Sequence, residues 1–310
     1  MGIRDGEERT VARMEEARQA GGAEVFSGVA CELGEGPHAS PPLGRLFWFD
    51  ILGRRLHEQG FDGGGARSHA LPFMASAMAT VDADRQLLAA EDGLYLREVA
   101  DGRLTLHRPL EADRPDTRSN DARTHPSGAF WVSTIGRDAE PGRAAVYWYR
   151  AGELRRLYAG LTIPNAIAFS ADGGTGYLAD GGEGTIWRIP LDPATGLPSG
   201  DRRLFHRAGG DDGAPDGAVV DADGLLWNAR YGAGRIDAFD GEGRRVRSVA
   251  LPARQATCPA FAGADAGMLV ATTAWQGMDA AARAAEPAAG MTFRLPFRVR
   301  GRFDPPVRIA

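Results

Sequence analysis

Four short strings in this sequence carry acidic or amide side chains that could bind a cation. Glu35 lies in LGEGP, Asn120 and Asp121 lie in RSNDA, Asn165 lies in IPNA, and Asp216 lies in APDG. Each string taken alone is typical of an ordinary turn. Taken together, their carboxylate and amide oxygens would form a site for a hard divalent cation such as Ca²⁺, Mg²⁺ or Mn²⁺. This chemistry depends on a fold that brings the four strings to one place.

A strand-turn-strand unit recurs six times along the chain, at spacings of roughly forty to fifty residues. The first strands of these units are predicted at 46–49, 87–90, 130–133, 176–179, 225–228 and 268–271. The second strands are predicted at 55–58, 94–97, 145–148, 185–188, 235–238 and 291–294. Two adjacent strands joined by a short turn form a hairpin, and a hairpin cannot bury its faces without neighbours. A closed ring of such units supplies those neighbours.

The repeat length is typical of a propeller blade, which has four strands. Apolar segments at 79–81 and 166–169 supply innermost strands, and residues 23–26 are expected to pair into the last blade and join the two ends of the ring. A two-layer α/β fold would require helical periodicity between the strands, and no convincing helical stretch follows residue 20. The sequence therefore predicts an all-β fold, a six-bladed β-propeller of four-stranded antiparallel blades.

Composition limits the function classes. The 310 residues include 42 Gly and 19 Pro, which indicates many turns, and the net charge of -5 gives no electrostatic reason to bind nucleic acid or an anionic membrane. We find no membrane-spanning segment and no secretory leader, and expect a cytoplasmic protein, a monomer or small homo-oligomer. Cys31 and Cys258 are expected to be structural thiols. Residues 1–20 are predicted to be a short helical or disordered extension before a single domain at 21–310.

The propeller also predicts where the polar strings meet. The innermost strands of all blades begin near one mouth of the central channel, and each of the four strings precedes a predicted innermost strand. We therefore expect Glu35, Asn120, Asn165 and Asp216 to converge at that mouth. His38 could face the same pocket or be a packed or surface histidine.

These strings, in this order, resemble the SMP-30/gluconolactonase family, also called regucalcin-like. The matching segments are LGEGP at 33–37 with WFDI at 48–51, RSND at 118–121, IPN at 163–165, and PDG at 215–217 followed by DADGLLW at 221–227. The resemblance runs from about residue 24 to residue 295 with compatible spacing. Two departures concern residues next to the site: Ala122 and Ala166 stand where the family usually has Gly. The fold is expected to tolerate Ala166 if its φ stays below zero.

The resemblance implies one divalent metal ion in the channel, Ca²⁺, Zn²⁺, Mn²⁺, Mg²⁺ or Fe²⁺. By motif, Glu35, Asn165 and Asp216 match the metal ligands, and Asn120 matches a fourth residue at or beside the metal that also belongs to the substrate site. Arg118 and Asp121 match positions that contact substrate hydroxyls or the carbonyl. The substrate implied is a small-molecule sugar lactone of the gluconolactone, xylonolactone, arabinonolactone or galactonolactone type.

Lactone hydrolysis requires a polarised carbonyl, an activated water and stabilisation of a tetrahedral oxyanion. Asp216 is the candidate general base, because a carboxylate beside a cation and a bound water can accept a proton at short range. Arg118 could orient the lactone or stabilise the oxyanion, and Asp121 could hold a sugar hydroxyl. Two alternatives stay open: a non-catalytic calcium- or metal-binding propeller like regucalcin, and a hydrolase of another ester.

Overall fold

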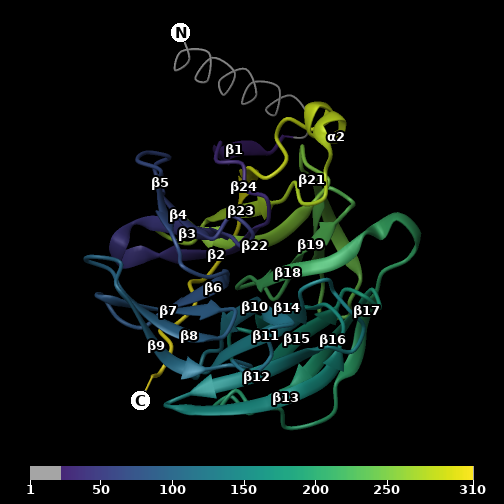
Figure 1. Cartoon of the computed structure of the whole chain (residues 1–310). Coiled ribbons are helices and arrows are strands. Elements are labelled where there is room, and N and C mark those ends of the chain that lie inside the picture. Colours follow the sequence, from purple (N-terminus) through teal and green to yellow (C-terminus); the bar gives the residue numbers. More distant parts are fainter. Residues whose placement is uncertain (1–21, 310) are drawn as a thin grey trace.

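The structure is a computed structural model that describes residues 22–309. Over that range, six four-stranded antiparallel sheets are arranged as the blades of a propeller. In Figure 1 the innermost strands β2, β6, β10, β14, β18 and β22 surround the centre, and the outermost strands lie at the periphery. The predicted fold class is confirmed. The predicted extension at residues 1–20 lies outside the described residues, so its conformation and the domain boundary stay predictions.

The blades are given from the innermost strand outward. Blade 1 contains β2 (Gly34–Ser40), β3 (Arg45–Asp50), β4 (Arg55–Gly60) and β5 (Arg67–Ala70), and blade 2 contains β6 (Ala75–Thr80), β7 (Arg85–Ala90), β8 (Gly93–Glu98) and β9 (Leu104–Pro109). Blade 3 contains β10 (Thr117–Thr124), β11 (Phe130–Gly136), β12 (Ala144–Arg150) and β13 (Glu153–Leu161). Blade 4 contains β14 (Pro164–Phe169), β15 (Thr175–Asp180), β16 (Thr185–Pro190) and β17 (Arg203–Arg207). Blade 5 contains β18 (Ala214–Val220), β19 (Leu226–Tyr231), β20 (Arg235–Phe239) and β21 (Arg245–Ala250).

Blade 6 joins the two ends of the propeller. Its strands are β22 (Ala256–Ala262), β23 (Met268–Thr273), β24 (Thr292–Arg298) and, from the start of the described chain, β1 (Glu24–Ser27). Strand β1 pairs antiparallel with β24, with Glu24 opposite Arg294 and Val25 opposite Phe293. This pairing confirms the predicted closure, which removes the open sheet edges that a linear array would carry.

The burial pattern explains why the repeats are strongly apolar. Strands β3, β7, β11 and β15 are buried along almost their whole length because both faces of each sheet pack against neighbouring blades. Trp48, Trp131 and Trp227 are among the largest fully buried side chains. The outermost strands β9 and β21 are largely exposed. The interfaces between blades are therefore the hydrophobic core of this fold.

Helices are few and short. Besides the two 3₁₀ turns η1 (Pro41–Leu43) and η2 (Gly210–Asp212), the described residues contain one α-helix, α2 (Ala280–Ala285), which the sequence analysis missed. The Asp279 side chain begins it by accepting a hydrogen bond from the Ala282 N–H at 2.8 Å. Among the described residues, no helix has both the length and the apolar character that crossing a bilayer requires.

Every innermost strand has an irregular register at the same place. The shifts fall between Glu35 and His38, Ala75 and Ala77, Ser119 and Ala122, Asn165 and Ala168, Pro215 and Ala218, and Ala256 and Pro259. A β-bulge bends the strand and redirects the side chains beside it. The bulge is thus a repeated device that can direct side chains into the channel.

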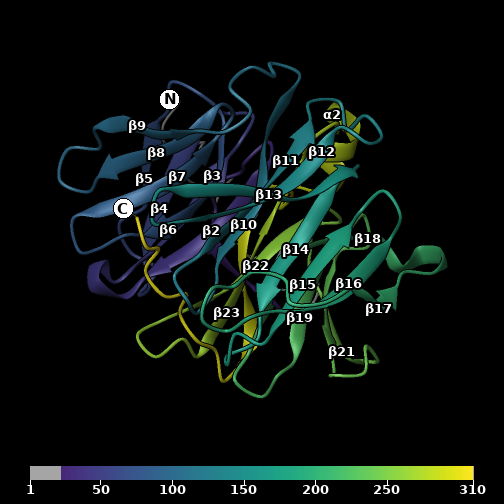
Figure 2. The same cartoon turned by 90° about the horizontal axis from the view of Figure 1, so that it is seen from below.

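The C-terminal segment after β24 runs across the opposite ends of the innermost strands. It hydrogen bonds in turn to blade 5 (Ala222 N–H to Arg300 O, 2.7 Å), to blade 2 (Val307 N–H to Thr80 O, 2.8 Å) and to blade 3 (Arg308 N–H to Gly128 O, 2.9 Å). In Figure 2 this yellow segment passes from the region of β22 and β23 toward β6 and ends at the label C. The C-terminal segment therefore covers the end of the channel opposite the bulges.

One buried ion pair fixes the C-terminal segment to the channel. Arg123, on β10, is 8% exposed and donates from Nη1 to Asp304 Oδ2 at 2.9 Å. Its Nε donates to Ile167 O at 3.2 Å. A guanidinium left in this position without its carboxylate would be a buried, uncompensated charge.

We expect Asp304→Ala to lower the free energy of unfolding by about 3 kcal/mol, because it leaves Arg123 buried without an anion. Urea unfolding followed by tryptophan fluorescence measures this change. The control is Glu153→Ala, which removes the partner of Arg155 in a solvent-exposed pair and should leave stability unchanged. Equal effects of the two substitutions would contradict the role given to the Arg123–Asp304 pair.

Candidate functional site

A cavity of about 400 Å³ opens at the bulge end of the channel. Glu35, Arg118, Asn120, Asn165 and Asp216 all line it, and they come from β2, β10, β14 and β18 in blades 1, 3, 4 and 5. Residues that are far apart in the sequence therefore line the same cavity, as the sequence analysis predicted. The other lining residues are Leu33, Ile135, Gly136, Arg137, Asp138, Ala139, Ile163, Gly181, Ala214, Pro215, Tyr231 and Gln276.

These side chains belong to a ring of equivalent positions. In each innermost strand one residue with a side-chain oxygen stands either at the start of the register shift or directly after it. These six residues are Glu35, Ser76, Asn120, Asn165, Asp216 and Thr257. The expectation that the four polar strings precede the innermost strands was wrong, because the residues lie within these strands. The bulges within the strands place these residues at the channel, and the turns before the strands do not.

The two remaining members of the ring do not line the cavity. The Ser76 hydroxyl donates to Ser119 Oγ at 2.9 Å, and the Thr257 hydroxyl donates to Gly34 O at 2.5 Å. Their short side chains connect neighbouring innermost strands to one another. Blades 2 and 6 therefore support the ring, while the other four blades supply its ionisable and amide groups.

A short hydrogen-bond chain orders one side of the cavity. Arg118 Nη1 donates to Ser119 O at 2.8 Å and to Asn120 Oδ1 at 3.2 Å. Asn120 Nδ2 donates to Asn165 Oδ1 at 2.8 Å and to Pro164 O at 3.1 Å. The Asn120 amide thus links Arg118 to Asn165 and fixes the orientation of both side chains.

Glu35 and Asp216 form the acidic part of the cavity. Each accepts a hydrogen bond from the next residue's N–H: Gly36 to Glu35 Oε2 at 3.2 Å, and Gly217 to Asp216 Oδ1 at 2.9 Å. Burial and then the charge of Asp121 raise the pKa of Glu35 to about 8. Burial, followed by the charges of Glu35 and Asp121, raises the pKa of Asp216 well above its usual range. The two carboxyl groups therefore resist ionisation in each other's presence.

The balance of charge at the cavity favours a bound cation. Burial lowers the pKa of Arg118 to about 10, so its guanidinium stays charged at neutral pH. The single positive charge of Arg118 does not neutralise the carboxylates of Glu35, Asp216 and Asp121 when all three are ionised. Carboxylate and amide oxygens of the kind gathered here are the donors that hard divalent cations prefer. The residues present thus fit a divalent cation, which would favour the ionised carboxylates.

The structure does not bring Asp121 to the cavity wall. Its carboxylate Oδ2 accepts the Ile167 N–H at 2.8 Å, and the residue is buried beside Arg123. Burial raises its pKa to about 6 although Arg123 opposes the shift. Asp121 therefore acts on the cavity through its charge, and a direct contact with a sugar hydroxyl has no support in its position.

The structure decides between the alternatives for His38 and contradicts the expectation for Ala166. His38 is buried away from the 400 Å³ cavity, and its Nε2 lies 2.9 Å from Thr80 Oγ1, so it is a packed histidine. Ala166 has φ of 56°, which contradicts the expectation of a negative φ. The bulge of β14 places Ala166 in the left-handed region, where Gly fits best, and Ala accepts it at a modest cost in energy. Gly36 has a similar φ of 53° beside Glu35.

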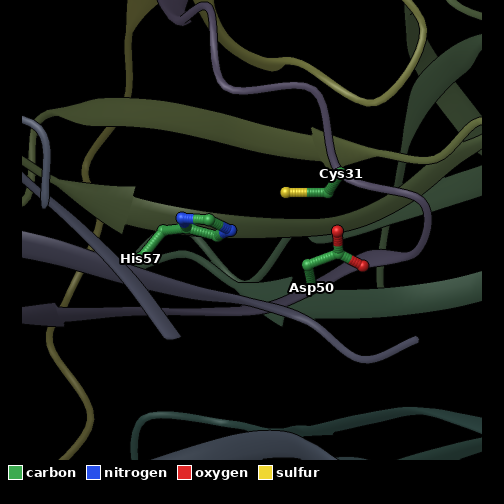
Figure 3. Close-up of side chains that lie close together, drawn as sticks. All are labelled: Cys31, Asp50 and His57. Atoms are coloured by element: carbon green, nitrogen blue, oxygen red, sulfur yellow. The ribbon is translucent and has the colours of Figure 1, made fainter. Parts of the chain in front are cut away.

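A second group of potential ligands lies inside blade 1. Ligand atoms of Cys31, Asp50 and His57 lie within 4.8 Å of one another, and Figure 3 shows their side chains. Asp50, however, accepts hydrogen bonds from the N–H groups of residues 32, 33 and 53 at 3.0–3.2 Å. Asp180 makes the same type of contacts with residues 162, 163 and 182 in blade 4. The Asp50 geometry is thus a repeated loop contact and needs no metal.

Both cysteines are buried and free, which confirms the expected structural thiols. Cys31 packs with Trp48 between blades 1 and 6. Burial raises the pKa of the Cys258 thiol well above its usual range, so the protonated form is favoured.

Sequence reasoning missed several residues of the cavity wall. Tyr231 ends β19 and pairs with Ala214 at the start of β18, two residues before Asp216. Burial and then the charges of Asp216 and Glu35 raise the pKa of Tyr231 to about 12, so its hydroxyl is a donor. The hairpin register was the signal that could have identified it, since its partner strand carries Asp216.

Arg137 also lines the cavity, from the chain that follows β11. Its Nη2 donates to Glu91 Oε2 at 2.6 Å and its Nε donates to Pro115 O at 2.7 Å. These contacts hold the guanidinium at the rim. No sequence motif marked this position, because its role follows from a contact with blade 2.

Comparisons with known proteins agree with this architecture. A family model described as "SMP-30/Gluconolactonase/LRE-like region" matches residues 33–275. A sugar-lactone-lactonase-like protein of Rhizobium meliloti (strain 1021) is 47% identical over 285 residues, or 92% of this chain and 97% of the relative. The L-arabinolactonase of Azospirillum brasilense is 33% identical over 285 residues, or 90% and 93% of the two chains. The crystal structure of a calcium-binding protein, regucalcin, from Agrobacterium tumefaciens str. C58 has a TM-score of 0.91 at 46% identity and covers 93% of this chain and 97% of that chain.

Without a cation, stability should fall as pH rises from 6.5 to 8. The folded protein holds the Glu35 proton up to a pKa of about 8, whereas the unfolded chain releases it near 4.5, so raising the pH favours unfolding. We expect a decrease of about 2 kcal/mol over this window. The buried histidines His38 and His57, whose pKa values burial lowers to about 4, offset part of this decrease near pH 6.5, because the unfolded chain still binds protons at its histidines there and the folded protein does not.

Urea unfolding in the presence of a chelator measures this slope. Glu35→Gln should make it shallower and leave the part that Asp216 contributes, and Glu32→Gln, at a residue outside the cavity wall, should leave it unchanged. A slope that is the same in all three proteins would show that the cavity carboxyl groups do not control it.

Proposed function

The chain belongs to the SMP-30/gluconolactonase/LRE-like family, and from this premise we propose that it is a carboxylic ester hydrolase that opens sugar lactones with the help of a divalent cation. The observation that carries the proposal is the shared cavity, where the carboxyl groups of the half-buried Glu35 and the buried Asp216, two amides and a guanidinium line one wall. The named lactonases among the relatives support the same reaction class.

We propose an aldonolactone as the substrate, of the gluconolactone, xylonolactone, arabinonolactone or galactonolactone type. A cavity of about 400 Å³ has room for one sugar ring with its hydroxyl groups. Polar groups surround it: Arg118 and Asn120 on one side, and Tyr231 and Gln276 elsewhere on the wall. Hydrogen-bonding side chains of this kind distinguish sugars by individual hydroxyl groups.

Glu35, Asn165 and Asp216 would hold the cation, and Asn120 would stand beside it. When bound, a divalent ion at this position supplies Lewis acidity toward a carbonyl oxygen and lowers the pKa of a coordinated water. Asn120 is better suited to positioning than to ligation, because its amide already bridges Arg118 and Asn165. The candidate ions are Ca²⁺, Zn²⁺, Mn²⁺, Mg²⁺ and Fe²⁺.

Asp216 is the proposed general base. Its Oδ1 accepts the Gly217 N–H, and Oδ2 has no hydrogen bond among the described residues, so one oxygen is available to accept a proton from water. The water oxygen then adds to the lactone carbonyl carbon. When the ring C–O bond breaks, the proton passes to the departing ring oxygen, and the product is the open-chain aldonic acid.

Arg118 is the proposed electrostatic stabiliser of the tetrahedral intermediate. Within residues 22–309 only its Nη1 donates hydrogen bonds, to Ser119 O and Asn120 Oδ1, and the residue lines the cavity. Its other N–H groups can donate to an oxyanion without reorganisation, because the surrounding hydrogen bonds already fix the side chain. Asp121 contributes by its buried charge.

The remaining partner proposals follow from the composition. We propose a small-molecule substrate, no nucleic-acid or membrane partner, a cytoplasmic location, and a monomer or small homo-oligomer. The alternative function is a calcium-binding, non-catalytic propeller, which the description of the Agrobacterium relative as a calcium-binding protein favours. A hydrolase of another ester is the second alternative.

Purified protein that is stripped of metal and reloaded with single divalent ions should acidify solutions of the four lactones faster than they hydrolyse spontaneously. Asp216→Asn should lower turnover by about 100-fold or more, because it removes the proton acceptor. The matched control is Asp223→Asn, at an exposed carboxylate that pairs with Arg300 far from the cavity. Ion binding without acceleration of any lactone would favour the calcium-binding alternative, and activity on simple esters alone would favour the second.

Tyr231→Phe should raise KM for the preferred lactone by about two- to tenfold with little change in kcat, because it removes one hydrogen-bond donor from the wall. Steady-state kinetics on the wild type and the variant measure this split. Tyr177→Phe, at a buried tyrosine that packs on Phe205 outside the cavity, should leave both constants unchanged. An unchanged KM in Tyr231→Phe would remove this residue from the substrate site.

A further inference from the structure

A second cavity, of about 320 Å³, lies between blades 1 and 2. Blade 1 contributes Arg45 from β3, Glu58 from β4, and Arg67 and His69 from β5. Blade 2 contributes Arg97 from β8 and the turn at 99–102. In Figure 1 these strands approach one another on the left side, away from the central ring. The two cavities share no lining residue, so this one is separate from the site in the channel.

Among the described residues, Arg97 is a buried cation without an ionic partner. Its side chain lines the cavity although the residue is only 5% exposed, and its one hydrogen bond is from Nη1 to Gln86 Oε1 at 2.9 Å. No carboxylate of residues 22–309 lies within 4.0 Å of its guanidinium. Burial lowers the pKa of Arg97, and the charges of Glu58 and Asp101 oppose this shift. The remaining N–H groups of the guanidinium can donate to an anion or to water in the cavity.

The nearest carboxylate cannot meet this requirement. Glu58 is contacted by Arg45 Nε at 2.6 Å, by His69 Nε2 at 3.0 Å and by Arg67 Nη1 at 3.8 Å. Asp101, the other acidic residue on the wall, lies on the outer turn, where its carboxylate faces Arg103 at 3.9 Å. Three guanidinium groups therefore face two carboxylates that are already engaged. The cavity has an excess of positive charge and of hydrogen-bond donors.

We propose that this cavity between blades 1 and 2 binds a phosphate-type oxyanion, free or as a small phosphate monoester, through Arg97 and Arg67. The fork of a guanidinium matches two oxygens of such an anion. Arg97 is held in place by Gln86 and presents its remaining donors to the cavity. Arg67 is largely exposed and only loosely paired, so it can close on the anion from the outer side.

The geometry also predicts a structural effect of the anion. Arg67 belongs to blade 1 and Arg97 to blade 2, so one anion would connect two neighbouring blades across their interface. A ligand that binds only the folded state stabilises it in proportion to the logarithm of its concentration. Phosphate should therefore raise the unfolding temperature even when the channel site is empty. The proposal does not depend on lactone hydrolysis.

Isothermal titration of the full chain with inorganic phosphate, and separately with glucose 6-phosphate, tests the proposal at constant ionic strength in chloride. We expect saturable binding of one anion per chain. Arg97→Met, which keeps the aliphatic packing, should weaken binding by about tenfold or more. Arg155→Met, at an exposed arginine of blade 3 that does not line this cavity, should bind as the wild type does. Binding of both probes identifies a phosphate ester site, and binding of inorganic phosphate alone identifies a site for the free anion.

Arg67→Gln provides a second variant that does not disturb the core, since this side chain is 68% exposed. It should weaken phosphate binding by about three- to tenfold and leave the unfolding temperature without phosphate unchanged. The proposal is overturned if the wild type shows no saturable binding of either probe. It is equally overturned if both Arg97→Met and Arg67→Gln bind phosphate as tightly as the wild type.

Discussion

The bulge near the start of each innermost strand is the constraint on which the rest of this molecule depends. Six strands share it because six blades share one architecture, and in four of the blades a residue at the bulge lines the cavity with an oxygen-bearing side chain. A regular strand would alternate its side chains between the two faces of the blade, where they would be covered by neighbouring blades. Because the bulge breaks this alternation, residues from four blades can line one cavity.

The bulge has a cost that the surrounding contacts offset. It has a left-handed backbone at Gly36 and Ala166, and it places Glu35 close enough to Asp216 to oppose the ionisation of Asp216. Such a site is destabilising by itself and depends on the rigidity of the ring. That rigidity comes from the buried interfaces between blades and from the closure of the ring by β1. Strain and charge at the channel are therefore linked to packing far from it.

Electrostatic contacts follow the channel from one end to the other. Glu35 and Asp216 lie at the bulge end, Asp121 and Arg123 follow along β10, and Asp304 of the C-terminal segment pairs with Arg123 at the opposite end. The C-terminal segment thus completes the channel as well as the fold. Between blades, by contrast, Arg97 has no such partner, which is why the second cavity differs in character from the first.

The sequence by itself determined the repeat, the strands and the identity of the polar residues. Hairpin spacing and apolar strands are local properties, so the six predicted strand pairs correspond to β3–β4, β7–β8, β11–β12, β15–β16, β19–β20 and β23–β24. The tertiary structure decided which side chains reach the cavity, because their direction depends on strand register and on the packing of neighbouring blades. It placed Glu35 and its equivalents within bulged strands, turned Asp121 away from the cavity, packed His38 against Thr80, and brought Tyr231 and Arg137 to the wall. Side-chain direction at a bulge depends on strand pairing and on contacts between blades, and neither is encoded in the spacing of residues along the chain.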